Sequence, residues 1–361
     1  MAGRIVLFGA TGYTGALVAR ALVARGAAPV LAGRSRERVE ALAAQLGGLQ
    51  PAVADVVRPP SIRALLEPGD VLVCTVGPFV RWGRPALHAA LDAGAHYLDS
   101  TGEPPFIRTV FEDHDAPAQA AGVGLLTAFG YDYVPGNLAG ALALRDAGER
   151  AVSVDVAYFV GGGAQFSGGT RASAAAMLTE PAYAFAGGRL VSERTARRVR
   201  SFDGRPAVSV GATEQFALPR VHPGLRDARV WLGWFGPASH PLQAISAATS
   251  LATRLPGVRG AIEAVAGRLV KGSTGGPDAA TRARGRSFVV AIASDAQGAP
   301  LATVRLEGDN PYDFTAGMLA WGALAAAGGK LRGAGALGPV DAFGLEALQA
   351  GVAAAGITHR A

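Results

Sequence analysis

Apolar residues in the first third of the chain form short runs that alternate with segments of helical period. Residues 5–8 form an unbroken apolar run without helical period, which is typical of a strand buried on both faces. Residues 13–25 then follow the period of a helix. Further strands are predicted at 29–32, 51–57, 71–75, 95–98 and 123–127, with helices at 35–46, 60–66, 82–93 and 106–121. Six strands alternating with helices predict an α/β fold with a doubly wound parallel sheet.

The pattern changes after Ala151. Residues 152–158 alternate apolar and polar positions, which predicts a half-buried strand in a sheet with one open face. A glycine-rich loop is expected at 161–169, a helix carrying Ser173 at 170–177, strands at 207–210, 228–233, 287–293 and 301–307, a surface loop at 271–286, and helices at 312–327 and 344–354. We therefore predict an N-terminal Rossmann domain (1–130), an inserted α+β substrate or dimerisation domain (131–310) and C-terminal helices (311–361).

Three glycines at a spacing of three lie between the first strand and the first helix. Such glycines let the backbone approach a pyrophosphate, and the free N–H groups and positive dipole end of the helix point toward it. Glycine is common here, at 50 of 361 residues, so the strand before and the helix after carry the interpretation. We favour dinucleotide binding over a turn that only packs helix on strand. The predicted cofactor-binding residues of this turn are Gly9, Thr11, Gly12, Tyr13, Thr14 and Gly15.

The end of the second strand distinguishes between the two nicotinamide cofactors. An NAD site places an acid there for the ribose 2′-hydroxyl, but this chain has Arg34, followed by Ser35. A guanidinium suits a 2′-phosphate, so we predict NADPH; the alternative is a solvated arginine that opens the next helix. Asp55 is expected to face the adenine. The loop after the fourth strand is expected to run along the nicotinamide ribose with Val76, Gly77, Pro78 and Phe79.

Several motifs in order carry a family resemblance, which covers most of the chain. They are residues 9–15, 33–35, 76–79, 97–103, 130–137, 167–170 and 311–316. Together they resemble the saccharopine dehydrogenase-like oxidoreductases, in particular the trans-acting enoyl reductase branch. The resemblance implies that the C-terminal helices return to the first domain and that residues 130–137 pass beside the nicotinamide. Tyr133 replaces the usual Ser of that motif and Asn137 the usual Asp, so the resemblance implies no particular substrate.

Tyr131, Asp132 and Tyr133 are the candidate catalytic residues. In a reductase the cofactor supplies the hydride, and side chains position the acceptor and stabilise or protonate the charge that develops. A tyrosine would hydrogen-bond an enolate or alkoxide, and Asp132 would orient it or a water. The alternative is structural: Tyr131 packs between the domains and Asp132 caps the following segment. Asp99 and Glu103 leave the same choice open between acid–base and capping roles.

Composition excludes other classes. The net charge is +6 and the pI about 9.9, but only Lys271 and Lys330 are lysines and the arginines are scattered, so we expect no nucleic-acid partner. The six histidines lack ligand spacing, so no metal is expected. The single Cys74 is interpreted as a buried apolar residue in a reducing cytoplasm. Neither lysine lies four residues after a tyrosine, which excludes the Tyr-x-x-x-Lys mechanism.

One stretch, residues 230–253, has no charged side chain and contains Trp231, Trp234 and Phe235. Its two prolines would break a membrane-spanning helix, so we favour a pocket wall or a homodimer interface over membrane-surface contact or plain core. The sequence thus predicts a cytoplasmic NADPH-dependent reductase of a small apolar or acyl-like substrate with a conjugated C=C, C=O or C=N bond. The alternatives are a saccharopine-type amino-acid dehydrogenase, which would need converging cations of which only Arg171 is well placed, and a non-catalytic NADP-binding sensor or interaction protein.

Overall fold

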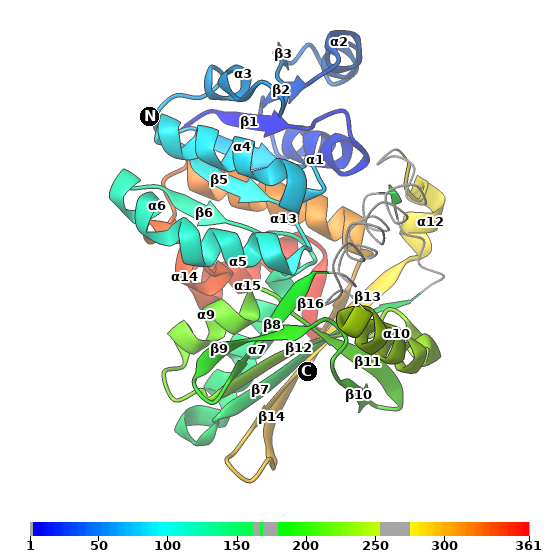
Figure 1. The fold of residues 1–361 in the computed structure, drawn as a ribbon. Helices are drawn as coiled ribbons and strands as arrows, with labels where there is room; N and C mark the ends of the chain where they lie inside the picture. Colours follow the sequence, from blue (N-terminus) through cyan, green and yellow to red (C-terminus); the bar gives the residue numbers. More distant parts are fainter. Residues whose placement is uncertain (1–2, 162–166, 169–179, 253–274, 361) are drawn as a thin grey trace. The chain divides into compact units, whose positions relative to one another are not determined.

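The computed structural model describes residues 3–161, 167–168, 180–252 and 275–360 (Figure 1). The chain divides into two compact units. The first unit consists of residues 1–101, 106–134 and 311–356, and the second consists of residues 102–105, 135–310 and 357–361. The helices expected at 312–327 and 344–354 therefore lie in the first unit, although they follow the second unit in the sequence.

A seven-stranded parallel sheet forms the centre of the first unit, counted over the residues that the structure describes. Its strand order is β15-β6-β5-β4-β1-β2-β3, which is the doubly wound arrangement predicted from the alternating pattern. The strands are β1 (Ile5–Phe8), β2 (Val30–Gly33), β3 (Pro51–Val53), β4 (Val71–Cys74), β5 (His96–Asp99), β6 (Gly124–Leu126) and β15 (Gly335–Ala336). The last of these was not predicted, because two residues carry no periodic signal.

Helices cover both faces of this sheet. The helix α13 (Pro311–Ala327) packs against α1 (Tyr13–Ala24) and contacts β1, β4 and β5, while α4 (Phe79–Ala93) contacts β4 and β5 from the opposite face (Figure 1). The remaining helices of this unit are α2 (Arg36–Gln45), α3 (Pro59–Arg63), α5 (Pro104–Asp113), α6 (Asp115–Ala121), α14 (Pro339–Phe343) and α15 (Leu345–Ala354).

The single helix expected over 106–121 is wrong, since the chain breaks it at His114 between α5 and α6. Pro117 explains the break. A continuous helix would need the backbone N–H of residue 117 to bond the carbonyl of residue 113, and proline has no N–H. Proline is tolerated in the first turn of a helix, which is where α6 places it.

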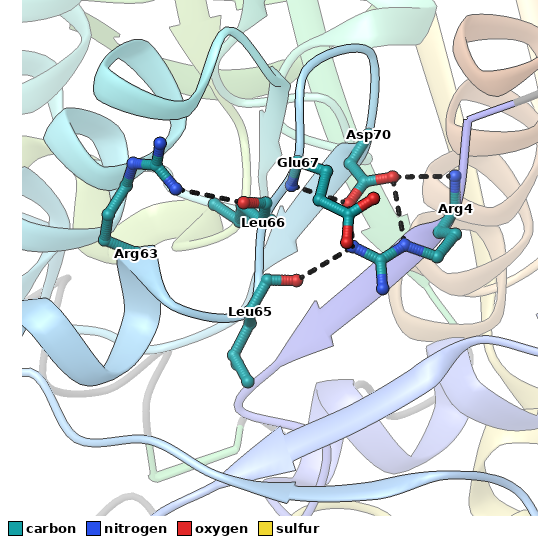
Figure 2. Close-up of polar contacts among 6 residues, drawn as sticks. All are labelled: Arg4, Arg63, Leu65, Leu66, Glu67 and Asp70. Atoms are coloured by element: carbon teal, nitrogen blue, oxygen red, sulfur yellow. Dashed lines mark hydrogen bonds and ion pairs between the residues drawn. The ribbon is translucent and has the colours of Figure 1, made fainter.

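An ionic clamp joins the starts of β1 and β4 (Figure 2). The buried Asp70 accepts hydrogen bonds from the backbone N of Arg4 at 3.0 Å, from its Nε at 3.3 Å and from its Nη2 at 2.6 Å. The backbone N of Glu67 donates to the same carboxylate at 2.9 Å. This clamp holds the register in which Ile5 pairs with Val71, and therefore the relative positions of the loops that leave the two strands.

The second unit is built on a mixed sheet with the order β10-β11-β12-β7-β13-β14-β16, to which β8 and β9 attach at β12. The pair β12–β7 is parallel and the other pairs are antiparallel. The strands are β7 (Ser153–Gly161), β8 (Pro181–Ala186), β9 (Arg189–Arg194), β10 (Val199–Phe202), β11 (Arg205–Val210), β12 (Asp227–Leu232), β13 (Arg286–Ser294), β14 (Pro300–Gly308) and β16 (Ile357–Arg360).

Two expectations for this sheet are corrected. The alternation predicted for 152–158 holds only at the start of β7, because Ala157, Tyr158 and Phe159 are all buried. The strand lies between β12 and β13 in the sheet, and its middle residues are buried on both faces. The end of the chain is not helical: β16 pairs with β14 in the second unit.

The helices of the second unit are α7 (Val134–Ala147), α9 (Glu214–Val221), α10 (Ser239–Ala252) and α12 (Ala279–Arg284), with short 3₁₀ turns at Gly148–Arg150 and Gly236–Ala238. The uncharged stretch expected to form one surface is divided among β12, a 3₁₀ turn and α10. Across the described part of the chain, no helix is long and apolar enough to span a bilayer. Most of the glycine-rich loop expected at 161–169 lies outside the described residues, as does the helix expected at 170–177 with Arg171 and Ser173.

Candidate functional site

The glycine turn after β1 is fixed by backbone contacts that admit no side chain. Gly9 has φ +90°, a left-handed conformation that favours glycine, and its N–H donates to the carbonyl of Ala32 at 2.9 Å. The N–H of Gly12 returns to the carbonyl of Gly9 at 2.9 Å. A Cβ on Gly15 would collide with that same carbonyl oxygen. The backbone of the glycine turn therefore lies directly against the backbone of the first helical turn of α1, with no room for a side chain at Gly15.

The N-terminus of α1 retains its capacity to bind an anion. Gly12 is the N-cap and supplies no side-chain hydrogen bond, and the first turn contains no acidic residue. The first N–H groups of a helix have no intrahelical partner, and the helix dipole adds a partial positive charge at this end. This geometry suits a pyrophosphate. That Gly9, Thr11, Gly12, Tyr13, Thr14 and Gly15 bind the cofactor stays a prediction.

The loop after β4 lies directly against the glycine turn. A Cβ on Gly9 would meet the Thr75 Oγ1 at 2.7 Å and the Val76 Cγ2 at 2.8 Å. The Thr75 hydroxyl donates to the carbonyl of Gly9 at 3.2 Å, so the side chain ties the two loops together. The structure thus brings together two of the predicted cofactor segments at the carboxyl ends of adjacent strands.

Within this second loop, the predicted residues differ in exposure. Gly77 is exposed, and the Gly77–Pro78 peptide is cis. Phe79 was expected in the loop but is the first residue of α4. It is buried, and its ring packs on that of Phe106 at a centroid distance of 5.6 Å. A role for Phe79 in cofactor binding would have to come from its backbone.

Arg34 follows β2 with an exposed side chain that contacts no described partner by hydrogen bond or ion pair. Its guanidinium is therefore available for a phosphate. Ser35 is the N-cap of α2, and its hydroxyl accepts from the backbone N of Arg38 at 3.4 Å, which gives it a structural function. Arg38 was missed by the sequence reasoning: its Nη2 donates to the carbonyl of Thr11 at 2.8 Å, so this second arginine touches the glycine turn. No local pattern signals this contact, because it joins residues 27 apart.

Asp55 closes a turn after β3. Its carboxylate accepts from the backbone N of Val57 at 3.2 Å, and its carbonyl accepts from the N of Arg58 at 2.9 Å. The strand ends at Val53, four residues earlier than expected, because this turn begins immediately after it. These contacts hold the turn and leave the predicted adenine contact as a prediction.

Asp99 at the end of β5 organises the exit of β6. It is fully buried; Oδ1 accepts from the backbone N atoms of Thr101 and Ala128, and Oδ2 accepts from the Thr127 hydroxyl at 2.8 Å. Burial raises the pKa of this carboxyl to about 6, against the lowering effect of these donors. Of the two roles left open by the sequence, this geometry favours the structural one, because the carboxylate binds Thr101 after its own strand and Thr127 and Ala128 shortly before residues 130–133.

Residues 130–133 form a tight loop in the first unit. The N–H of Val134 donates to the carbonyl of Gly130, and the N–H of Tyr133 donates to Ala128 at 2.8 Å. The Asp132–Tyr133 peptide is cis. Tyr131 is 2% exposed, and its backbone N donates to the Thr315 Oγ1 on α13 at 3.0 Å.

The two tyrosines and the aspartate of this loop have different environments. The Tyr131 ring packs edge-on against Phe314, and Tyr133 is 1% exposed. Asp132 is only half-buried, but its Oδ1 is shielded from solvent and accepts no hydrogen bond. Burial raises the pKa of this carboxyl to about 7, and no cation or donor offsets the effect. The three candidate residues therefore differ in their chemistry. Asp132 carries a carboxyl with a pKa near neutral pH, whereas Tyr131 and Tyr133 are packed aromatic side chains.

Other candidate chemistry is accounted for. Cys74 is buried within β4, and desolvation raises the pKa of its thiol to about 12, which makes it unreactive. Among the described residues, no group of three or more His, Cys, Asp or Glu side chains is placed to hold a metal ion.

Comparison with known proteins agrees with this geometry. The family described as "Saccharopine dehydrogenase NADP binding domain" matches residues 5–126. A Mycobacterium tuberculosis protein named as a trans-acting enoyl reductase is 38% identical over 187 residues, which are 48% of this chain and 44% of the relative. The trans-acting enoyl reductase of Mycobacterium leprae is 39% identical over 140 residues, 37% of this chain and 34% of that one. The chain therefore spans less than half the length of these curated relatives.

A solved structure extends the likeness of fold over the whole chain. Apo saccharopine dehydrogenase (L-Glu forming) from Saccharomyces cerevisiae aligns with a TM-score of 0.57 and 12% identity, covering 99% of both chains. Residues 5–126 thus match an NADP-binding domain, and the likeness of fold covers 99% of the chain. The resemblance to the saccharopine dehydrogenase-like oxidoreductases that the motifs predicted is confirmed.

Proposed function

We propose that this protein is an NADPH-dependent reductase in which Asp132 supplies the proton that accompanies hydride transfer. NADPH when bound supplies the hydride. The observation that carries the proposal is the Asp132 carboxyl: its Oδ1 is buried without a hydrogen bond, and its pKa is raised to about 7. A general acid works best with a pKa near the working pH, and perturbed carboxyls concentrate at functional sites.

The place of Asp132 in the sheet supports this role. Residues 130–133 follow β6, whose carboxyl end lies on the same edge as the glycine turn after β1. Two strands lie between β6 and β1, so the two exits are three strand spacings, about 14 Å, apart. Ligands of doubly wound sheets bind along this edge. The glycine turn would hold the pyrophosphate, and the loop after β6 would lie toward the other end of the dinucleotide.

Tyr131 and Tyr133 remain candidates as positioning residues for this acid. Both rings are buried, and the loop between Gly130 and Val134 is fixed by backbone hydrogen bonds on either side of Asp132. Such a frame limits the directions in which the carboxyl can point. We therefore assign the proton to Asp132 and expect the Tyr131 and Tyr133 hydroxyls to affect its orientation.

The proposed substrate is apolar or acyl-like, with a conjugated C=C bond as the first choice. The curated relatives are named as enoyl reductases, and that name supports this choice over C=O and C=N acceptors. A saccharopine-type amino-acid dehydrogenase is the second candidate, because the likeness of fold extends over the whole chain. We also propose a homodimer, and the support for it is the stretch without charged side chains that begins in β12 and continues through α10.

The experiment is NADPH oxidation followed at 340 nm against matched panels of enoyl thioesters, ketones, cyclic imines and 2-oxo acids with an amine donor. We expect turnover with the enoyl thioester, at least tenfold faster with NADPH than with NADH. Asp132→Asn should lower kcat by about 10²–10³ while NADPH binding stays within twofold. The matched control is Asp113→Asn, an exposed carboxyl of the same unit, which should leave kcat unchanged.

Three results would contradict the proposal, in whole or in part. Turnover with only the 2-oxo acid and amine pair would make the protein an amino-acid dehydrogenase. NADPH binding without oxidation of any acceptor would favour a sensor. Full kcat in Asp132→Asn, with an enoyl substrate still reduced, would leave the reductase standing and refute the assignment of the proton donor.

A further inference from the structure

A surface cleft of about 500 Å³ lies on the second unit, within the size range of small-ligand sites. Its walls come from β7, from β10 and the residue before it, from β12 and from α10. The side chains that matter for its chemistry are Asp155, Arg198, Arg200, Arg229, Trp231 and Gln243. We propose that this cleft binds the phosphoryl group of a small ligand, separately from the cofactor of the first unit.

Strand register gathers these side chains on one face of the sheet. Asp155 on β7 is paired with Arg229 on β12, and Trp231 lies two residues further along β12. Arg200 on β10 is paired with Ala207, which is two residues from the partner of Trp231 on β11. Paired residues and residues two apart point to the same side of a sheet. The helix α10 contacts β10 and β11 (Figure 1). It brings Gln243 to the same cleft.

The charges of the cleft are unequal, with three guanidinium groups against one carboxylate. That carboxylate is already engaged: Asp155 Oδ1 accepts from the Trp231 Nε1 at 2.7 Å, and Oδ2 pairs with the Nη1 of Arg200. Arg229 uses Nη2 to pair with Asp227 at 3.0 Å. Each guanidinium has five N–H donors, so both arginines keep donors beyond these pairs.

Arg198 is the cation without a counterion. It is exposed, it lines the cleft, and its guanidinium makes no hydrogen bond or ion pair with any described residue. Its sequence neighbour Arg197 is also exposed, but it pairs with Glu193 at 3.9 Å and does not line the cleft. Gln243 is held in place because its Nε2 donates to the carbonyl of Arg197 at 2.9 Å.

A phosphoryl group fits this arrangement better than a monocarboxylate. Guanidinium forks bind phosphate through paired charge-assisted bonds, and the second negative charge of a phosphate monoester suits more than one arginine. Asp155 would not repel the ligand strongly, since Arg200 and the Trp231 N–H already neutralise it. Trp231 forms the floor of the cleft, and its burial keeps that floor fixed.

The test is calorimetric titration of the full chain with inorganic phosphate at constant ionic strength, in saturating NADPH so that the cofactor's phosphate positions are filled. Sodium acetate is the monocarboxylate arm, and phenyl phosphate distinguishes an ester from free phosphate. We expect phosphate to bind at least fivefold more tightly than acetate. Arg198→Gln should weaken phosphate about tenfold, and the control Arg197→Gln less than twofold.

The outcomes separate clearly. Tighter binding of phenyl phosphate than of inorganic phosphate would support a phosphate monoester, and equal binding would support free phosphate. Equal effects of Arg198→Gln and Arg197→Gln would overturn the site, as would acetate binding as tightly as phosphate or the absence of saturable binding to the wild type. The Arg198 guanidinium has no hydrogen-bond or ion-pair partner among the described residues, and Arg198→Gln keeps the backbone bonds to Ser209, so the variant should unfold at the wild-type temperature. The result does not depend on whether the protein is a reductase.

Discussion

Replacing Asp132 by Asn should stabilise the folded protein at neutral pH while removing activity. The pKa of this carboxyl is raised from 3.8 to about 7 by burial. Between these values the folded protein keeps a proton that the unfolded chain releases. The contribution of this carboxyl to the unfolding free energy is therefore fully present below about pH 4. It falls as pH rises to about 7 and does not change further above that pH. At 1.36 kcal/mol per pKa unit, the loss is at most about 4 kcal/mol.

The variant removes this pH dependence. Its amide leaves a neutral polar group unpaired, which costs about 1–3 kcal/mol at every pH. The informative quantity is therefore the unfolding free energy of the variant minus that of the wild type. What matters is how this difference changes with pH. We expect that difference to move in favour of Asp132→Asn by about 2–4 kcal/mol from pH 4 to pH 8, since the half-buried side chain retains some hydration.

The assay is urea unfolding followed by tryptophan fluorescence at pH 4, 6 and 8, with Asp113→Asn as the matched control. The control carboxyl is exposed, so its difference from wild type should be constant across this range. A difference for Asp132→Asn that is also constant, or that moves against the variant as pH rises, would refute the reasoning. In the first case the folded-state pKa of the carboxyl would be ordinary and in the second it would be lowered, and in both the carboxyl would lose its claim to be the proton donor at neutral pH.

Three further predictions concern the cofactor domain. Arg34→Ala should weaken NADPH binding about tenfold and leave NADH within twofold, measured by fluorescence titration; equal losses would mean that the guanidinium does not contact the 2′-phosphate. Gly15→Ala should abolish binding of both cofactors because its Cβ collides with the carbonyl oxygen of Gly9, and unchanged titrations would disprove this packing. Asp70→Ala should lower the unfolding free energy by about 2–3 kcal/mol, because it leaves several part-buried donors without the carboxylate they share. Glu67→Ala, at an exposed ion pair, should lower it by less than about 0.5 kcal/mol, and equal losses would mean the clamp does not stabilise the fold.

The first sheet was predictable because its strands, except the edge strand β3, are almost wholly buried. The runs at β1 and β4 are entirely buried, and such runs stand out from the amphipathic helices between them. Very short elements gave no periodic signal. The strand β15 is an example, because it has only two residues. The division of one expected helix into α5 and α6 had a visible cause in Pro117, which the helical period obscured.

The cofactor segments were likewise visible, because a glycine turn between a strand and a helix is a local pattern. The contact of Arg38 with Thr11 was not, since it joins residues 27 apart through one side chain. The state of Asp132 depends on neighbours still further away. Tyr131 is held by Thr315, which is 184 residues later in the chain, and the backbone before it by Asp99. Motif comparison located the loop. Only the packing in the structure shows that Asp132 and the two tyrosines of this loop have different environments.

The most direct test of the central claim is transfer of the label from NADPH deuterated at nicotinamide C4 to an enoyl thioester, with the product analysed by mass spectrometry. The account predicts that the saturated product gains one deuterium from one of the two C4 faces, and that Asp132→Asn lowers the rate without changing the label. A saturated product without deuterium, or no product while NADPH stays bound, would contradict it.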